Sequence, residues 1–145
     1  MKVLLLVFLL TCGRVGIAQD SKAAQAFAGC YELRVKGWHP FTSFDLLPTR
    51  FQLTTRPIER GFAVKSFDAS VRKELPLSSW NLKDDGKIEI IWSTGFVGWE
   101  IRLSRDLRGT ARSFADVDPQ PSGDVTVVIR AVDCRGFEKS RSDQR

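Results

Sequence analysis

The sequence predicts an all-β domain: an eight-stranded antiparallel up-and-down barrel, in which consecutive strands pair as a meander. Three observations lead to this fold. Apolar and polar residues alternate with period two from Phe27 onward, short turn sequences separate the alternating runs, and no window after Ala26 has a clear 3.6-residue apolar period. The length of 145 residues allows one domain, and 43% hydrophobic with 27% charged residues is typical of a globular protein.

Residues 1–18 are expected to be a signal peptide. Lys2 supplies the positive start, Val3–Leu10 is an unbroken apolar run, and Gly16-Ile17-Ala18 provides the small residues before a cut. The apolar run is too short to span a bilayer, and no later stretch approaches the ~20 residues required. We therefore expect a secreted or periplasmic protein without a transmembrane segment. The alternative is a lipid anchor at Cys12, because the residues before it loosely resemble a bacterial lipobox.

The mature chain is expected to consist of three parts. Residues 19–26 form a lead-in with room for a turn or two of helix, 27–134 form the barrel, and 135–145 form a polar basic tail. The formal charge of +5 falls to +3 when Lys2 and Arg14 leave with the signal peptide, and the tail carries +2 of that remainder. Nucleic-acid binders concentrate basic residues on one face of the fold. Because the excess here lies on the tail, no nucleic-acid partner is expected.

The eight runs have a common pattern of one apolar and one polar face. They are predicted at Cys30–Lys36, Arg50–Thr54, Phe62–Phe67, Trp80–Lys83, Lys87–Thr94, Val97–Leu103, Leu107–Ala115 and Asp124–Cys134. The bulky residues expected inside are Tyr31, Leu33, Phe51, Leu53, Phe62, Trp80, Ile88, Ile90, Trp92, Trp99, Ile101, Leu103 and Ile129. Asp84-Asp85-Gly86, Thr94-Gly95 and Arg105-Asp106 are expected to be tight turns, and Ser70–Leu77 has room for one helical turn.

The cysteines favour a closed barrel over a two-sheet sandwich, which is the alternative arrangement of eight strands. After loss of Cys12, Cys30 in the first strand and Cys134 at the end of the last remain. A closed meander makes these strands antiparallel neighbours, so we expect a disulfide in this oxidising compartment. Two free thiols are the alternative. Placing the cysteines directly opposite each other would also oppose Arg34 to Arg130; a bulge, or diagonal pairing of Arg130 with Glu32, would relieve this.

The first strand opens with Gly29-Cys30-Tyr31, which resembles the Gly-x-Trp opening of lipocalins and other calycins with Tyr in place of Trp. Arg130 is loosely similar to the basic residue that packs across that aromatic residue in the family. The resemblance implies a lipocalin-like barrel that binds a small apolar ligand inside it. Alternation within the last strand, however, directs Arg130 outward.

The segment from Trp38 to Pro48 is the longest connection between predicted neighbouring strands and is rich in aromatic residues. It could cover a cavity at the barrel mouth, or its aromatic side chains could plug that end of the barrel. In the first case a small apolar or amphipathic ligand is expected to contact Trp38, His39, Phe41, Phe44, Trp92 and Trp99. In the second, a packed barrel would act as a protein-interaction module through its loops. The small residues Gly109, Ala111, Ser113 and Ala115 leave room for a ligand or for a neighbouring Trp.

Catalysis is not expected. His39 with Asp45 could form an oriented imidazole, but no nucleophile motif accompanies them. A single His and three Cys leave little material for a metal site, so neither a metal nor another cofactor is expected. Gly95 and Gly98 are interpreted as turn and bend residues, because no helix follows them to bind a phosphate.

Overall fold

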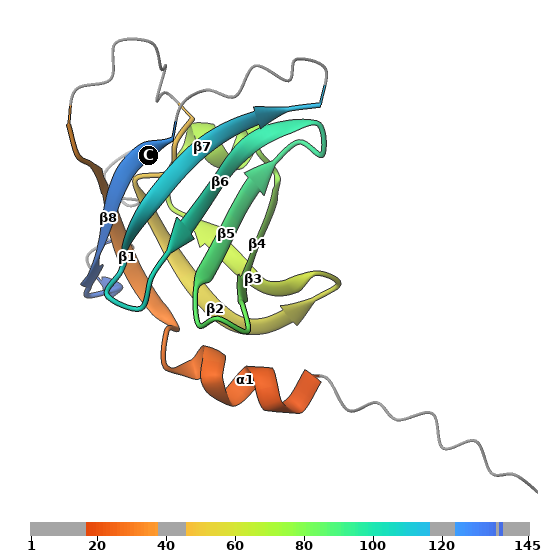
Figure 1. Cartoon of the computed structure of the whole chain (residues 1–145). Helices are drawn as coiled ribbons and strands as arrows, with labels where there is room; N and C mark the ends of the chain where they lie inside the picture. Colours follow the sequence, from red (N-terminus) through yellow and green to blue (C-terminus); the bar gives the residue numbers. More distant parts are fainter. Residues whose placement is uncertain (1–16, 38–45, 117–123, 136, 138–145) are drawn as a thin grey trace, which may run out of the picture.

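The eight strands close into one antiparallel barrel in the computed structural model, which describes residues 17–37, 46–116, 124–135 and 137. Each strand pairs with the next in sequence, and β8 pairs with β1 to complete the wall (Figure 1). The fold class predicted from the sequence is therefore confirmed. Each strand therefore has a paired neighbour on both sides.

The predicted strands are all present, with small differences at their ends. In chain order the elements are α1 (Ile17–Gln25), β1 (Gly29–Val35), β2 (Arg50–Ile58), β3 (Gly61–Ser66), α2 (Ala69–Glu74), β4 (Leu77–Leu82), β5 (Ile88–Ser93), β6 (Val97–Leu103), β7 (Arg108–Ala115) and β8 (Val125–Val132). Strand β2 is longer than expected because it continues past Pro57, where its register against β3 shifts. Proline lacks an N–H donor, which is why it sits at such an irregularity rather than within a regular ladder.

The barrel interior is a packed apolar core. Every bulky residue predicted to face inward is buried, and Trp80, Ile88, Ile90, Trp92, Ile101 and Leu103 have no exposed surface. Trp92 packs edge-on against Phe51 with ring centroids 5.2 Å apart, and Trp80 packs against Phe62 at the same distance. Burial of this kind is the main favourable contribution to folding, at roughly 1.5–3 kcal/mol for each large apolar side chain.

Tight turns join the strands where they were predicted. Gly86 and Gly95 have φ of 77° and 104°, a backbone conformation that glycine adopts without steric cost. In the turn after Arg105-Asp106 the positive φ of 64° falls on Leu107. Ser104 supports that turn by accepting the backbone N–H of Leu107 at 3.0 Å on its carbonyl oxygen.

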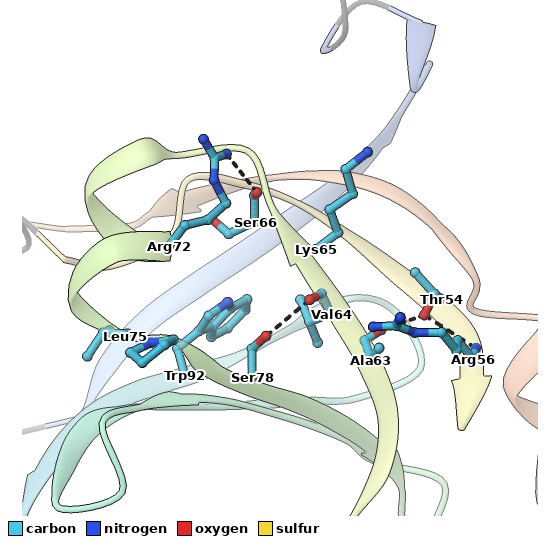
Figure 2. A pocket seen from close by; sticks show the side chains of 11 residues that line it. Thr54, Arg56, Ala63, Val64, Lys65, Ser66, Arg72, Leu75, Ser78 and Trp92 are labelled. Atoms are coloured by element: carbon cyan, nitrogen blue, oxygen red, sulfur yellow. Dashed lines mark hydrogen bonds between the residues drawn. The ribbon is translucent and has the colours of Figure 1, made fainter. Parts of the chain in front are cut away.

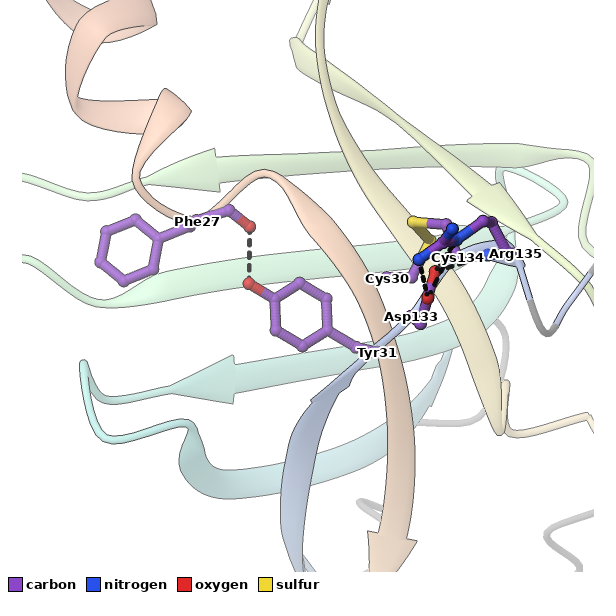
Figure 3. Close-up of a disulfide and its surroundings, with 6 residues drawn as sticks. All are labelled: Phe27, Cys30, Tyr31, Asp133, Cys134 and Arg135. Carbon is purple, nitrogen blue, oxygen red and sulfur yellow. Dashed lines mark hydrogen bonds and ion pairs between the residues drawn. A yellow bond between two sulfur atoms is a disulfide. The ribbon is translucent and has the colours of Figure 1, made fainter.

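Helix α1 lies at one end of the barrel, below the strands in Figure 1. Ala24 is fully buried, and the chain then turns into β1. The Tyr31 hydroxyl donates a 2.8 Å hydrogen bond to the carbonyl oxygen of Phe27, which fixes this turn (Figure 3). Burial raises the pKa of Tyr31 above its ordinary value. The expected signal cut after Ala18 lies within the bounds of α1.

The seam between β1 and β8 carries the predicted Cys30–Cys134 disulfide. The sulfur atoms are 2.10 Å apart and the Cα atoms 5.3 Å apart (Figure 3). Cys30 lies opposite Val132 in the register, so the cysteines bond diagonally rather than as direct cross-strand partners. This register places Glu32 opposite Arg130 and Arg34 opposite Val128, which avoids the like-charge pair.

Arg130 does not take the role that the lipocalin resemblance implied. Its side chain is exposed on the outer face of β8, whereas Tyr31 points into the core. The reason is the period of two: Ile129 faces inward, so the next residue faces solvent. The similarity to lipocalins is therefore one of coarse architecture.

Candidate functional site

The barrel wall is interrupted between β3 and β4. These two strands pair only at Phe62 with Trp80 and at Ala63 with Ser79, and beyond that point they separate. Helix α2 occupies the connection on the side where they diverge. The Ser78 hydroxyl donates a 3.0 Å hydrogen bond to the carbonyl oxygen of Val64, so a side chain replaces the missing ladder contact.

A register shift in β2 contributes to the separation. The shift lies between Leu53 and Pro57 and frees the carbonyl oxygen of Thr54, which accepts the Trp80 indole N–H at 2.8 Å. The Thr54 hydroxyl in turn donates to the carbonyl oxygen of Ala63 at 2.7 Å. The irregular stretch is thus held by specific hydrogen bonds on both sides of β3.

Helix α2 is held in place by hydrogen bonds of the residue before it and of a side chain on the helix. Asp68, which precedes it, uses its carboxylate to accept the backbone N–H groups of Thr49 at 2.7 Å and Arg50 at 3.1 Å. On the helix itself, the Arg72 guanidinium donates a 3.1 Å hydrogen bond to the carbonyl oxygen of Ser66. Val71 is buried in the core and anchors the middle of the helix.

A pocket of about 480 Å³ lies at this interruption of the wall. Its walls come from β2, β3, α2, β4 and β5 and consist of Thr54, Arg56, Ala63, Val64, Lys65, Ser66, Arg72, Leu75, Pro76, Ser78 and Trp92. Figure 2 shows the Trp92 ring among Leu75, Ser78 and Val64, with Arg72 and Lys65 higher in the view. Pockets for small ligands fall in the range of roughly 300–1,000 Å³, so the size suits one organic molecule.

Trp92, which lies in the pocket wall, has an unpaired polar atom. The residue has no exposed surface, and its indole Nε1 has no hydrogen-bond partner. Trp80, on the neighbouring strand, is equally buried but donates its indole N–H to Thr54. Leaving a buried donor unpaired costs roughly 1–3 kcal/mol, so an acceptor brought into the pocket within reach of Trp92 would recover that cost.

The charged residues in the described lining of the pocket are all basic. Arg56, Lys65 and Arg72 are exposed at its edge, and we call these three residues the basic rim. No Asp or Glu is among the lining residues that the structure describes. Lys65 additionally packs its ammonium group over the ring of Phe67, 5.0 Å from the centroid, which orients the Lys65 side chain.

Of the residues predicted to bind a ligand, the structure describes Trp92 and Trp99, and of these two only Trp92 lies in the pocket wall. Trp99 is buried directly opposite Trp92 on β6 but is not part of that wall. Trp38, His39, Phe41 and Phe44, together with Asp45, lie outside the described residues. The end of the same segment is described, and Leu47 and Pro48 are buried there.

Sequence reasoning did not anticipate the contribution of β3, β4 and α2. Two signals were available: Pro57, shortly after the alternating run Arg50–Thr54, and a helical turn between two strands of a meander. The small residue at position 109 of β7 is explained by strand packing and not by a ligand cavity. A Cβ atom at Gly109 would overlap the carbonyl oxygen of Arg102, so the glycine permits close approach of β6.

Comparison with known proteins gives no match to a protein family, to a curated protein or to a solved structure. Among the described residues, no group of three or more His, Cys, Asp or Glu side chains could hold a metal ion. In that same part of the chain, no helix has both the length and the apolar character needed to cross a membrane.

Proposed function

We propose that this protein is a lipocalin-like binding protein for a small apolar or amphipathic molecule, which it holds in the pocket between β3 and β4. The observation that carries the proposal is Trp92, a buried residue with an unpaired indole nitrogen that lies in the wall of a pocket of about 480 Å³. Val64, Leu75 and Pro76 add apolar surface beside the indole ring. Together they offer a ligand both apolar contact and one hydrogen-bond donor.

Binding of an uncharged dye tests this function. The probe is N-phenyl-1-naphthylamine, whose fluorescence rises in apolar surroundings, together with native mass spectrometry to detect molecules that co-purify. Ser78→Phe should fill the pocket and abolish dye binding. Ser79→Phe is the matched control, because Ser79 is equally half-buried on the same strand but does not line the pocket. Dye binding that is the same in both variants would contradict the proposal.

We also propose that the chain is exported and cut after Ala18. The Cys30–Cys134 bond supports this, since structural disulfides persist in oxidising compartments. The intact mass of the exported protein checks it. A chain that begins at Gln19 is expected, whereas a heavier chain that begins at a lipidated Cys12 would establish the alternative, and an uncut chain would contradict both.

A second candidate function, protein interaction through the loops, is favoured by an exposed apolar cluster. Leu77, Phe96 and Val97 expose 55%, 67% and 42% of their surface. The β5–β6 turn holds Phe96 firmly outward: its backbone N–H donates to the Thr94 hydroxyl at 3.2 Å, and its carbonyl oxygen accepts the backbone N–H of Asp116 at 2.9 Å. Exposed apolar clusters of this kind mark interaction sites.

A photo-crosslinking residue separates this second function from the first. Phe96→p-benzoylphenylalanine should form a discrete adduct with a partner in the native compartment. The same residue at Glu59, in the exposed turn between β2 and β3, is the control. Identical labelling at both positions would exclude a specific interaction through the β5–β6 turn.

A further inference from the structure

We infer that the molecule bound between β3 and β4 is an organic anion, with its apolar part against Trp92 and its charged group at the basic rim. This inference rests on the proposed binding function and adds the chemical class of the ligand. The juxtaposition that carries it is a buried apolar wall that includes a residue with an unpaired donor, bordered by three cations, with no anion among the described lining residues.

The nearby acidic side chains are already engaged elsewhere. Asp68 binds the Thr49 and Arg50 backbone and lies 3.8 Å from the Arg50 Nε atom. Glu74 lies 3.8 Å from the Nζ atom of Lys73, outside the pocket wall. Neither carboxylate is paired with Arg56, Lys65 or Arg72, so the positive charge of the rim remains available to a ligand.

Arg72 is the best-positioned member of the basic rim. Its Nη1 atom is fixed on the Ser66 carbonyl oxygen, and that hydrogen bond sets the direction of the guanidinium group. A guanidinium has five N–H donors in a planar fork, so donors remain for a carboxylate, sulfonate or phosphate. The helix that carries Arg72 is itself anchored by buried Val71, which limits movement of the base of the side chain.

Trp92 selects against the opposite charge. An indole N–H only donates, so an ammonium group would leave it unpaired, whereas an anionic oxygen can accept from it. The donor and the rim therefore favour the same kind of ligand, one rich in acceptors and negatively charged. Because the rim cations are exposed to solvent, their attraction is screened by salt.

A matched pair of dyes tests the inference. N-phenyl-1-naphthylamine is neutral, and 1-anilinonaphthalene-8-sulfonate is the same ring system with an added sulfonate. The anionic dye should bind about tenfold more tightly at low salt, and this preference should shrink between about 50 mM and about 500 mM NaCl, where screening becomes strong. Ser78→Phe should abolish binding of both dyes, which confirms that each occupies the pocket.

Two substitutions locate the charged group and the donor. Arg72→Gln should weaken the anionic dye about fivefold and leave the neutral dye unchanged. Arg34→Gln removes an exposed arginine on the outer face of β1 and should change neither. Trp92→Phe should weaken the anionic dye more than the neutral one, and Trp99→Phe, which changes a buried tryptophan outside the pocket wall, should preserve the preference.

The outcomes distinguish failure of this inference from failure of the proposed function. Equal affinity for the two dyes, without dependence on salt, would overturn the anionic class while the binding function stands. Anion preference that survives Arg72→Gln would overturn the placement of the charged group. Absence of binding by both dyes would remove the binding function and this inference together.

Discussion

The carboxylate of Asp68 accepts the backbone N–H of Thr49 across a distance of 2.7 Å, and this hydrogen bond joins the start of β2 to the start of α2. The Thr49 hydroxyl donates to the same carboxylate at 3.1 Å. Asp68 precedes α2, but its side chain makes no capping hydrogen bond to that helix. Its carboxylate instead holds the start of α2 against the barrel. The pocket wall that α2 supplies therefore depends on this contact.

Asp68→Ala should lower the free energy of unfolding by about 2 kcal/mol, because several hydrogen bonds to one carboxylate are lost. It should also weaken dye binding, since Arg72 and Leu75 are then less firmly placed. Urea unfolding and the dye titration measure the two effects. Asp68→Asn, which keeps one acceptor oxygen, should lie between the wild type and the alanine variant. An unaltered pocket in Asp68→Ala would show that buried Val71 alone positions the helix.

Glu100 should make the stability depend on pH in acid. The residue is 7% exposed on the outer face of β6 and accepts hydrogen bonds from Nε of Arg102 and Nε of Arg112, each at 2.6 Å. Burial by itself would raise the pKa of Glu100, but the hydrogen bonds from Arg112 and Arg102 outweigh it and lower that pKa. A carboxylate with a lowered pKa stabilises the folded state above its unfolded pKa of about 4.3 and loses this effect as the pH falls.

Glu100→Gln is therefore expected to destabilise the protein by about 1–3 kcal/mol at neutral pH. The difference from the wild type should shrink as the pH drops through the lowered pKa of Glu100. Urea midpoints at neutral and acidic pH measure it. A difference that is constant over this range would mean that hydrogen bonding, and not the charge of Glu100, is responsible.

Removal of the disulfide should destabilise the barrel without changing its strand order. The bond joins residues separated by 104 positions, and loss of a bridge of this kind costs roughly 2–5 kcal/mol through the greater freedom of the unfolded chain. Cys30→Ser with Cys134→Ser should give a lower urea midpoint and a far-ultraviolet spectrum like that of the oxidised protein. Wild-type protein under reductant should reach the same midpoint, and insensitivity to reductant would contradict the pairing.

Gly98 and Gly29 should respond differently to the same added methyl group. A Cβ atom at Gly98 would overlap the carbonyl oxygen of Trp92 on the paired strand, whereas one at Gly29 would meet only the Tyr31 ring at 3.8 Å. Gly98→Ala should cost roughly 1–3 kcal/mol because the backbone must move apart, and Gly29→Ala should cost less than about 0.5 kcal/mol. Thermal melting of the two variants gives the comparison, and equal costs would refute it.

The strands of the barrel wall could be predicted from the sequence because the alternation of apolar and polar residues is a local pattern. In β1, alternation alone separated Tyr31 and Leu33 from Glu32 and Arg34, and burial follows that division. The cysteines added one long-range contact. Charge repulsion between Arg34 and Arg130 suggested a bulge or a diagonal pairing of Arg130 with Glu32, whereas the register places these two residues directly opposite each other. Each of these inferences depends only on the two-residue alternation of apolar and polar side chains and on closure of the strands into a barrel.

The pocket was not predictable in the same way. It depends on where β3 and β4 stop pairing, which follows from the shifted register before Pro57 and from the seating of α2 on Val71. Sequence reasoning identified Trp92 as a candidate but grouped it with Trp99, because both occupy inward positions on adjacent strands. Their difference is that Trp92 lines the pocket and Trp99 does not, and that is a property of the packed barrel.

The bond between Cys30 and Cys134 turns all eight strands into one covalent macrocycle, with the N-terminal helix and the C-terminal segment as its two appendages. A single backbone cut in any hairpin, such as that between Asp85 and Gly86, leaves every strand attached to every other. Between Cys30 and Cys134, the oxidised protein therefore has no point at which a single protease cut divides it in two. Nicked and intact molecules will differ in mass by one water and will come apart into fragments only when the disulfide is reduced.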